Sequence, residues 1–282
     1  MPARLLSGTD LAQKILKKLE PKVRELDPQL VILQVGSDPA SAVYIRRKIE
    51  ACKSIGMRHR HVHLEASTTF EHIRDQIRWL NADGDVTGII MQLPLPKPLA
   101  GKTPLLMKEL DPRKDVDGLT AYNQGKTLIA REFEHLPPAT PLAVVSLLEH
   151  GKFPVRAKHV VIVGASTIVG KPLSVMLMNR EATVTVCQKA TKNLAVHTRQ
   201  ADILITSVGK PGLIKKSMVK KGAIVIDVGI TQTAKGVRGD VDFDAVKSVV
   251  RAITPVPGGV GPMTVACLLR NVVTAKERQI VS

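Results

Sequence analysis

The sequence is poor in aromatic side chains: its 282 residues include one Trp, two Tyr and four Phe. Proteins that bind single-stranded nucleic acid usually stack the bases on aromatic rings, so this scarcity argues against that class. No apolar run approaches the roughly 18 residues that identify a membrane-spanning helix, so we expect no membrane span. The N-terminal residues show no basic stretch followed by an apolar one, so we also expect no signal peptide.

Cysteine is scarce as well, and its placement argues against two kinds of site. Cys52, Cys187 and Cys267 lie far apart and form no Cys-x-x-Cys pair. Such spacing predicts neither a zinc site nor a disulfide framework, and it fits a reducing, cytoplasmic environment. The sequence also lacks the Gly-x-Ser-x-Gly elbow, the His-Glu-x-x-His helix and the P-loop, which argues against hydrolytic triads and nucleoside triphosphatases.

The charge is strongly one-sided: 41 Lys and Arg residues stand against 25 Asp and Glu residues, which gives a formal net charge of +16. The positive residues are scattered, and the tightest clusters are Arg46-Arg47-Lys48 and Lys215-Lys216 with Lys220-Lys221. A solvated basic surface, an anionic small molecule and a nucleic acid would each explain such a charge. Charge alone therefore identifies no ligand.

Strand and helix patterns alternate in two series along the chain. Short apolar runs predict strands, and periodic apolar residues behind caps such as Asp10, Asp38 and Thr69 predict helices. The first series is expected to have strands at 30–35, 61–64 and 86–91, and the second at 159–163, 182–187, 201–206 and 223–228. Residues 111–138 are expected to be irregular, and a loop at 254–262 to precede a closing helix at 264–276. The order predicts α/β folds with mostly parallel sheets, and the length suits two domains with a boundary within 138–151.

The sharpest motif of the second half is a step from strand to helix at 161–172. A buried strand leads into Gly164-Ala165-Ser166 and then into a helix that begins near Gly170. Glycine lets a backbone approach a pyrophosphate, and a helix N-terminus offers it free N–H groups. The spacing is Gly-x-Ser-x-x-x-Gly rather than Gly-x-Gly-x-x-Gly, so an ordinary strand–helix turn with a packing glycine stays an alternative.

The end of the next strand bears on the choice of cofactor. NAD-binding folds often place an acidic residue there to hold the ribose hydroxyls. Here the strand ends in Cys187-Gln188-Lys189, and no Asp or Glu occurs between Ala182 and Lys192. A cation at this place suits the 2′-phosphate of NADP, although a solvated loop lysine would give the same sequence. Gly209 and Gly229 follow two further strands, at ends where such sheets bind ligands.

The first half offers a candidate substrate site. Tyr44 and Lys48 are four residues apart and share a helix face, and Gln92 follows the third strand. Asp115 and Asp117 alternate, so in an extended chain one can bind a ligand while the other is structural. A surface lysine and a capped turn are the simpler alternatives. The set lacks the His and further acidic ligands of a metal site, so we expect no metal.

Six sequence blocks occur in a fixed order: 35–41 with Tyr44 and Lys48, 92–96, 114–118, 164–170, 208–212 and 255–264. In this order they resemble the bifunctional methylenetetrahydrofolate dehydrogenase/methenyltetrahydrofolate cyclohydrolase family over nearly the whole chain. The resemblance implies a folate-binding catalytic domain of residues 1–139 and 264–282, and a Rossmann-like NADP-binding domain of residues 140–263. It also implies a cleft between these domains and a homodimer through the cofactor domains.

The resemblance implies a role for each candidate residue. Lys48 would be the catalytic lysine, and Gln92 would bond to it. Tyr44 would stack on the aminobenzoyl ring of the folate, and Asp117 would bind the pterin. Ser41 and the loop of Pro257, Gly258 and Gly259 would border the folate pocket. The cofactor would contact Gly164, Ala165, Ser166, Ile168, Lys189, Gly209 and Ile230.

The sequence departs from the family at two cofactor positions. Many members have arginine in place of Ala165 and histidine in place of Gln188. The alanine removes a cation that would help to hold the 2′-phosphate. Recognition of that phosphate would therefore depend more on Lys189.

The implied function is bifunctional. The enzyme would oxidise 5,10-methylenetetrahydrofolate with NADP⁺ to the 5,10-methenyl form and hydrolyse that form to 10-formyltetrahydrofolate, in the one-carbon metabolism that serves purine biosynthesis. NADP and polyglutamylated folates are anionic, which suits the net charge. A monofunctional dehydrogenase and a basic nucleic-acid-binding protein are the alternatives. The intact set of Lys48, Gln92 and Asp117 argues against nucleic acid as the partner.

Overall fold

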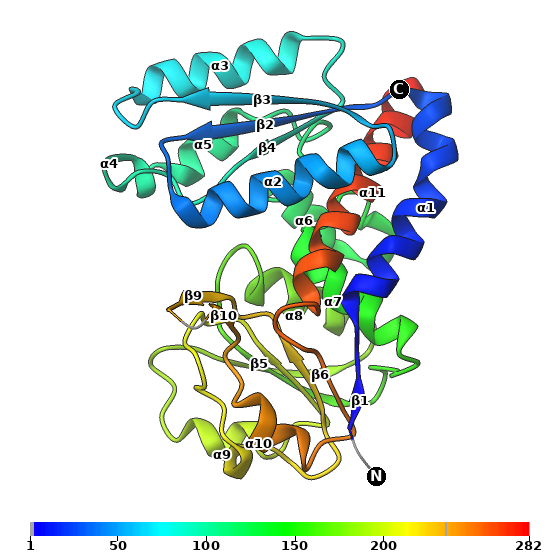
Figure 1. Cartoon of the computed structure of the whole chain (residues 1–282), viewed down its shortest axis with the longest axis vertical. Coiled ribbons are helices and arrows are strands. Elements are labelled where there is room, and N and C mark those ends of the chain that lie inside the picture. The colour runs from blue at the N-terminus through cyan, green and yellow to red at the C-terminus, as the bar shows by residue number, and fades with distance from the viewer. Residues whose placement is uncertain (1–2, 235, 282) are drawn as a thin grey trace. The chain divides into compact units, whose positions relative to one another are not determined.

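The computed structural model describes residues 3–234 and 236–281, and in it the chain forms two compact units (Figure 1). Unit 1 contains the chain up to Ala12, Thr127–Arg131 and Thr140–Thr264. Unit 2 contains Gln13–Lys126, Glu132–Ala139 and the chain from Val265 onward. Each unit contains a parallel β-sheet with helices packed against it, so the predicted two-domain α/β architecture is confirmed.

Unit 2 is built on a three-stranded parallel sheet in the order β3-β2-β4. Its strands are β2 (Gln29–Val35), β3 (Arg58–Leu64) and β4 (Gly88–Met91). The central strand carries an apolar run that is fully buried from Leu30 to Leu33, as expected for a parallel strand covered on both faces. Side chains alternate along a strand, so Leu30 and Ile32 enter one core cluster while Val31 and Leu33 enter another.

Helices cover both faces of this sheet (Figure 1). One face packs against α1 (Gly8–Leu26), α2 (Pro39–Ser54) and α11 (Val260–Val281). The other face packs against α3 (Phe70–Ala82), α4 (Lys97–Ala100) and α5 (Thr103–Glu109). After these come α6 (Ala121–Ile129) and a 3₁₀ turn at Arg131–Phe133. The two apolar faces of one sheet thus hold this unit together.

The starts of α2 and α3 confirm two predicted caps. The carboxylate of Asp38 accepts a hydrogen bond from the backbone N–H of Ser41 at 2.7 Å, and Pro39 occupies the first turn, where a missing N–H costs nothing. The hydroxyl of Thr69 caps α3 in the same way. The cap on α2 matters for the site because this helix carries Tyr44 and Lys48.

Unit 1 is built on a six-stranded parallel sheet in the order β1-β11-β8-β7-β5-β6. Its strands are β1 (Arg4–Leu5), β5 (His159–Val163), β6 (Thr183–Cys187), β7 (Ile203–Thr206), β8 (Ile224–Asp227) and β11 (Ala252–Ile253). The chain order reverses at β5, which has β6 on one side and β7 on the other. Open parallel sheets bind ligands at the carboxyl ends of the strands beside such a reversal. The strand order therefore predicts a ligand site at the carboxyl ends of β5 and β7.

Short helices and one hairpin complete unit 1. The helices are α7 (Ala139–His150), α8 (Gly170–Met178), α9 (Leu194–Thr198) and α10 (Phe243–Lys247), with a 3₁₀ turn at Lys216–Met218. An antiparallel hairpin of β9 (Thr231–Thr233) and β10 (Gly236–Arg238) follows β8. Within the described ranges of either unit, no helix is both long and apolar enough to cross a bilayer.

The division of the chain differs from the predicted domain limits of 1–139 with 264–282 and 140–263 in three places, of which the smallest is Thr264, the last residue of unit 1. The first twelve residues group with unit 1 because β1 pairs with β11 in its sheet. Thr127–Arg131 also group with unit 1, where the side chain of Asn179 donates a hydrogen bond to the carbonyl of Thr127 at 2.8 Å.

Three local predictions were wrong. The first helix begins at Gly8 rather than behind Asp10, and the hydroxyl of Ser7 accepts a hydrogen bond from the Asp10 N–H at 3.5 Å. The stretch 111–138 contains α6, whose start the Thr120 hydroxyl caps by accepting from a backbone N–H. The expected loop at 254–262 ends early because α11 begins at Val260, with a proline in its first turn where the helix tolerates it.

A buried asparagine of α11 fixes the segment that carries Asp117. Asn271 is 2% exposed, and its Nδ2 donates hydrogen bonds to the carbonyls of Val116 and Pro137, both at 2.9 Å. Gly118 has a φ of +68°, and a Cβ on it would lie 2.5 Å from the Pro137 carbonyl carbon. The chain around Asp117 is therefore held on both sides.

We predict that Asn271→Ala lowers the free energy of unfolding of the protein by about 1–3 kcal/mol, because it leaves two buried carbonyls without a donor. Gln279→Ala is the matched control: it removes a partly exposed amide of the same helix that donates to the carbonyls of Thr87 and Arg113, and water can replace it at the exposed Arg113 carbonyl. Urea unfolding followed by circular dichroism measures both. An equal loss in the two variants would contradict the role given to Asn271.

Candidate active site

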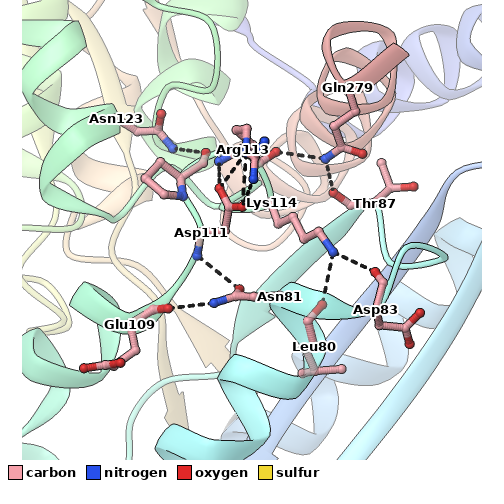
Figure 2. Close-up of polar contacts among 11 residues, drawn as sticks. Leu80, Asn81, Asp83, Thr87, Glu109, Asp111, Arg113, Lys114, Asn123 and Gln279 are labelled. Carbon is pink, nitrogen blue, oxygen red and sulfur yellow. Dashed lines mark hydrogen bonds and ion pairs between the residues drawn. The ribbon is translucent and has the colours of Figure 1, made fainter. Parts of the chain in front are cut away.

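Side chains from α3 and α11 form hydrogen bonds to the segment before Asp117, as Figure 2 shows. The amide of Asn81 donates to the carbonyl of Glu109 at 2.7 Å and accepts from the N–H of Asp111 at 3.1 Å. From α11, Gln279 Nε2 donates to the carbonyl of Arg113 at 3.1 Å. These contacts set the direction in which the chain enters the 114–118 block.

Lys114 anchors the start of this block to the end of α3. Its Nζ donates to the carbonyls of Leu80 at 3.1 Å and Asp83 at 2.7 Å, two acceptors of the kind that a helix C-terminus leaves unpaired (Figure 2). Partial burial lowers the pKa of Lys114, and the carboxylates of Asp111 and Asp83 oppose that shift. This lysine is thus part of the frame of the site and not of its chemistry.

The two aspartates of the block differ in burial and in hydrogen bonding. Asp115 is completely buried, and its carboxylate accepts hydrogen bonds from the N–H groups of Leu119 and Thr120 and from the amide of Asn123, at 2.8 to 3.1 Å. Asp117 is partly exposed, and no hydrogen bond to its carboxylate occurs within the described part of the chain. Asp115 is therefore structural, and Asp117 is available for a ligand.

A lysine–glutamine pair forms the centre of the site in unit 2. Lys48 Nζ on α2 donates to Gln92 Oε1 at 2.9 Å, and Gln92 directly follows β4. The Gln92 amide is oriented by its Nε2, which donates to the carbonyl of Leu93 at 2.8 Å. Gln92 is 8% exposed, so the lysine meets a fixed acceptor in a largely buried place.

Burial and a nearby carboxylate shift the pKa of this lysine in opposite directions. Burial lowers the pKa of the Lys48 amine below its usual range, while the charge of Asp117 raises it in part. Burial likewise raises the pKa of Asp117, and Lys48 opposes that shift. One turn along α2, burial raises the pKa of Cys52 to about 12, so this thiol stays neutral and forms part of the apolar wall. The result is an amine that gives up its proton more readily than an exposed lysine.

Tyr44 and Ser41 lie on the same helix as Lys48. Tyr44 is one turn before the lysine and is half-buried, and burial raises the pKa of its hydroxyl. The buried Ser41 donates from Oγ to the carbonyl of Leu93 at 3.4 Å, the same carbonyl that orients Gln92. The structure therefore brings together the predicted unit 2 residues around one face of α2 and the end of β4.

In unit 1, two glycines shape the predicted cofactor loop. Gly164 has a φ of +118°, and a Cβ on it would lie 2.6 Å from the carbonyl oxygen of Ser207 at the end of β7. A Cβ on Gly170 would lie 1.8 Å from the carbonyl oxygen of Gly164, so the loop doubles back tightly before α8. Inside it, the Ser166 hydroxyl accepts from the N–H of Val169 at 3.2 Å. The predicted step from strand through glycine turn to helix is confirmed.

The other predicted cofactor residues follow the same edge of the sheet. Lys189 is exposed two residues past β6, and Gly209, with a φ of +75°, is exposed past β7. Ile230 follows β8 and is 37% exposed, and Ile168 in the glycine loop is 42% exposed. Ala165 in the same loop is partly exposed. A cavity of about 330 Å³ at the amino ends of these strands, lined by Lys158 and Lys220 among others, contains none of these residues.

The loop of Pro257, Gly258 and Gly259 belongs to unit 1. Gly258 has a φ of +101°, and its carbonyl accepts hydrogen bonds from the N–H groups of Gly8 at 2.8 Å and Thr9 at 3.2 Å. A Cβ on Gly8 would lie 1.7 Å from the carbonyl oxygen of Gly259, so this contact requires glycine. The loop is thus fixed to the start of α1.

Two family models match most of the chain. One is described as the tetrahydrofolate dehydrogenase/cyclohydrolase catalytic domain and covers residues 6–117, and the other as the NAD(P)-binding domain of the same enzymes, over residues 138–280. The chain belongs to this family. The matched ranges place Lys48, Gln92 and Asp117 in the catalytic domain, and Gly164 and Lys189 in the NAD(P)-binding domain.

Full-length relatives agree with the family models. The bifunctional protein FolD of Helicobacter pylori is 43% identical over 289 residues, covering 99% of this chain and 98% of that protein. The solved structure of the bifunctional enzyme FolD from Campylobacter jejuni superimposes with a TM-score of 0.93 at 40% identity, covering 98% of this chain and 99% of that one. A Trypanosoma brucei FolD structure, described as complexed with NADP cofactor and inhibitor, gives a TM-score of 0.94 at 34% identity over 100% of both chains.

The end of β7 offers a polar group that fits the cofactor of this family. Ser207 Oγ is buried and has no hydrogen-bond partner within the described residues, and it would lie 2.8 Å from a Cβ on Gly164. A buried hydroxyl without a partner is costly, so a ligand atom at the glycine loop would satisfy it. The exposed loop, the missing Cβ and the unpaired hydroxyl together fit a dinucleotide at this edge.

Two buried carboxylates in the part of the chain that matches the NAD(P)-binding domain, Asp227 and Asp240, are not predicted from the sequence. Asp240 accepts hydrogen bonds from the N–H groups on both sides of Gly209, and Asp227 accepts from the N–H of Gly229. A weak signal exists in the sequence, because each aspartate lies next to or two residues from a glycine near a strand end. Charged residues are nevertheless usually exposed, so the pattern alone favours a surface turn.

Proposed function

We propose that this chain works as a bifunctional enzyme of folate one-carbon chemistry. It oxidises 5,10-methylenetetrahydrofolate with NADP⁺ to the 5,10-methenyl form and hydrolyses that form to 10-formyltetrahydrofolate. The observation that carries the proposal is the Lys48–Gln92 pair beside Asp117, inside a full-length match to the family. The intact pair favours the bifunctional enzyme over a monofunctional dehydrogenase.

Unit 1 supplies the positioning that hydride transfer requires. NADP⁺, when bound, accepts the hydride, and the protein's task is to hold the reacting groups close and aligned. We assign Gly164, Ala165, Ser166 and Ile168 to the phosphates, and Gly209 and Ile230 to the nicotinamide end. The exposed backbone at the ends of β5, β7 and β8 supports this assignment.

Lys48 is assigned to the hydrolytic step. Water must lose a proton when it attacks the methenyl carbon, and the ring nitrogen must gain one when the ring opens. An amine whose pKa is lowered by burial can exchange protons nearer neutral pH than an exposed lysine. Gln92 holds Nζ in place, and we assign Tyr44 to the aminobenzoyl ring one helical turn away.

Asp117 is assigned to the pterin of the folate. A carboxylate can accept two hydrogen bonds from neighbouring N–H groups, which suits the amino group and ring nitrogen of a pterin. No hydrogen bond reaches the Asp117 carboxylate within the described residues, which supports the assignment, as does the contrast with Asp115. We place Ser41 at the border of the same pocket.

The remaining partners are proposed from charge and exposure. We propose that the folate substrates carry polyglutamate tails, since a net charge of +16 favours anionic ligands. We propose a homodimer through unit 1, where the edge strand β6 exposes Val186 and α8 exposes Met178. A cytoplasmic location fits three buried cysteines that form no disulfide within the described residues.

A direct assay tests the function. The protein is mixed with methylenetetrahydrofolate and NADP⁺ while the absorbances of NADPH and of the methenyl form are followed. A second assay starts from methenyltetrahydrofolate without NADP⁺ and isolates hydrolysis. We expect activity in both assays. Activity in the first alone would make the enzyme a monofunctional dehydrogenase, and activity in neither would refute the proposal.

We predict that Lys48→Met lowers cyclohydrolase activity by roughly 10²–10⁴-fold, the usual value of general acid–base help. Dehydrogenase activity should fall much less, because hydride transfer needs no proton from the enzyme. Lys53→Met, on the exposed side of the same helix, is the control and should change neither activity. Full hydrolysis by the Lys48 variant would remove this residue from the mechanism.

We predict that Asp117→Ala raises the folate Kd by at least about tenfold, because the pterin loses charge-assisted hydrogen bonds of about 1.5–3 kcal/mol each. Calorimetric titration with a folate and with NADP⁺ measures the two affinities separately. The NADP⁺ affinity serves as the internal control and should not change. A loss confined to NADP⁺ would show that Asp117 serves another ligand.

We predict that Lys189→Ala raises the KM for NADP⁺ by about 5–30-fold, equivalent to roughly 1–2 kcal/mol, and leaves the KM for NAD⁺ nearly unchanged. The exposed lysine acts as a hydrated point charge, so the effect should shrink in high salt. Lys158→Ala, at the amino end of β5, is the matched control. An unaltered KM for NADP⁺ would shift the role to Lys192, and equal use of NADP⁺ and NAD⁺ by the wild type would refute the cofactor preference.

A further inference from the structure

Two buried carboxylates lie behind the cofactor edge of unit 1. Asp227 ends β8 and is 4% exposed, and Asp240 follows the β9–β10 hairpin and is completely buried. Within the described chain, each accepts three hydrogen bonds, and every donor is a backbone N–H or a hydroxyl rather than a lysine or arginine. Burying a carboxylate without a cation is expensive, so this arrangement requires an explanation.

Asp240 fixes the loop that contains Gly209. Its Oδ2 accepts from the N–H of Val208 at 2.7 Å and from the Thr206 hydroxyl at 2.8 Å, while its Oδ1 accepts from the N–H of Lys210 at 2.7 Å. The two N–H groups flank Gly209, whose φ of +75° is one that other residues rarely adopt. One carboxylate therefore sets the conformation of the whole turn past β7.

Asp227 fixes the turn before Ile230 and holds Asp240 in place. Its Oδ1 accepts from the N–H groups of Gly229 at 3.0 Å and Asp240 at 3.1 Å, and its Oδ2 accepts from that of Val241 at 2.9 Å. The loops past β7 and β8 are thus joined through one buried pair of side chains.

Two glycines make room for the pair. A Cβ on Gly229 would lie 2.2 Å from Cγ of Asp240, and a Cβ on Gly239 would lie 2.1 Å from Oδ2 of Asp227. Neither position accepts a side chain while the carboxylates occupy their sites. Burial and the neighbouring Asp240 also raise the pKa of Asp227 to about 7, a sign that this charge is held against a substantial cost.

We infer that Asp240, held by Asp227, is a positioning residue of the cofactor site: Asp240 fixes the backbone of Val208–Lys210, and Asp227 fixes the turn at Gly229 before Ile230, in the shape that receives the nicotinamide end of NADP. Asp240 acts through the loop that it holds and touches no ligand itself. The inference rests on the proposed function only in assigning Gly209 and Ile230 to the cofactor. The expected defect is therefore specific to NADP.

Asp240→Asn tests this inference. The variant keeps the size of the side chain, but in either orientation its amide NH₂ meets at least one of the N–H donors of Val208 and Lys210. We expect the Kd and KM for NADP⁺ to rise by about tenfold or more, as the loss of a charge-assisted hydrogen bond would cause. The NADP-independent hydrolysis of methenyltetrahydrofolate should stay within about twofold of the wild type.

Asp202→Asn is the matched control. Asp202 lies in the same unit at the amino ends of the strands, and it accepts from the N–H of His159 at 3.0 Å and from Lys220 Nζ at 2.7 Å. It should leave NADP⁺ binding unchanged. Thr206→Val is a milder second variant, because it removes only the hydroxyl that donates to Asp240, and we expect it to raise the KM for NADP⁺ by about 2–5-fold.

Two results would overturn the inference. One is a folded Asp240→Asn protein whose NADP⁺ affinity equals that of the wild type, and the other is a parallel loss of hydrolysis and NADP⁺ binding, which marks a general structural role. If Asp240→Asn does not fold, an unchanged KM in Thr206→Val overturns it. Absence of both activities in the wild type would instead refute the proposed function. The role of Asp240 would still be decided by calorimetric titration of the wild type and of Asp240→Asn with NADP⁺, because that measurement needs no activity.

Discussion

A strand that is buried on both faces can offer polar groups to a ligand only where it ends, and the candidate sites of both units depend on this constraint. In unit 2, Gln92 follows β4, and the capped start of α2 follows β2. In unit 1, the glycine loop follows β5, and the turns of Gly209 and Ile230 follow β7 and β8. Because the strands of the three-stranded and six-stranded sheets are all parallel, the carboxyl ends in each share one edge, and residues distant in sequence are brought together there.

The aspartates of the two candidate sites fall into two groups, according to whether their carboxylates accept hydrogen bonds from the protein. Asp115, Asp227 and Asp240 each accept three protein hydrogen bonds. Asp227 and Asp240 fix turns past strand ends, and Asp115 fixes the turn that leads into α6. Asp117 differs, since no protein donor reaches its carboxylate within the described residues and its main electrostatic partner is Lys48. A carboxylate with satisfied oxygens is part of the scaffold, whereas one with unused acceptors can recognise a ligand. Hydrogen-bond accounting thus separates the candidate ligand residue from three structural ones of the same type.

The sequence was sufficient to predict the structure where the signal is local. The strand at 159–163 and the caps at Asp38 and Thr69 are found as predicted, because apolar runs and side-chain caps act over a few residues. It was insufficient where pairing partners are distant: β1 and β11 have two residues each and exist only through their neighbours. The Lys48–Gln92 contact spans 44 positions and came from the family resemblance. Asp240 was missed because it and the two N–H groups that it accepts from lie in loops without periodicity.

The two proposed activities depend on different kinds of group. The cofactor edge of unit 1 is shaped chiefly by backbone, and part of that backbone is held by the Asp240 carboxylate that lies behind it. Hydride transfer depends on such fixed geometry, and it requires no proton from the enzyme. The site in unit 2 depends instead on one amine, whose pKa is lowered by burial and partly restored by Asp117. Changes to the loops of unit 1 should therefore alter cofactor affinity, whereas changes around Lys48 should alter the proton step, and the two activities can vary independently within one chain.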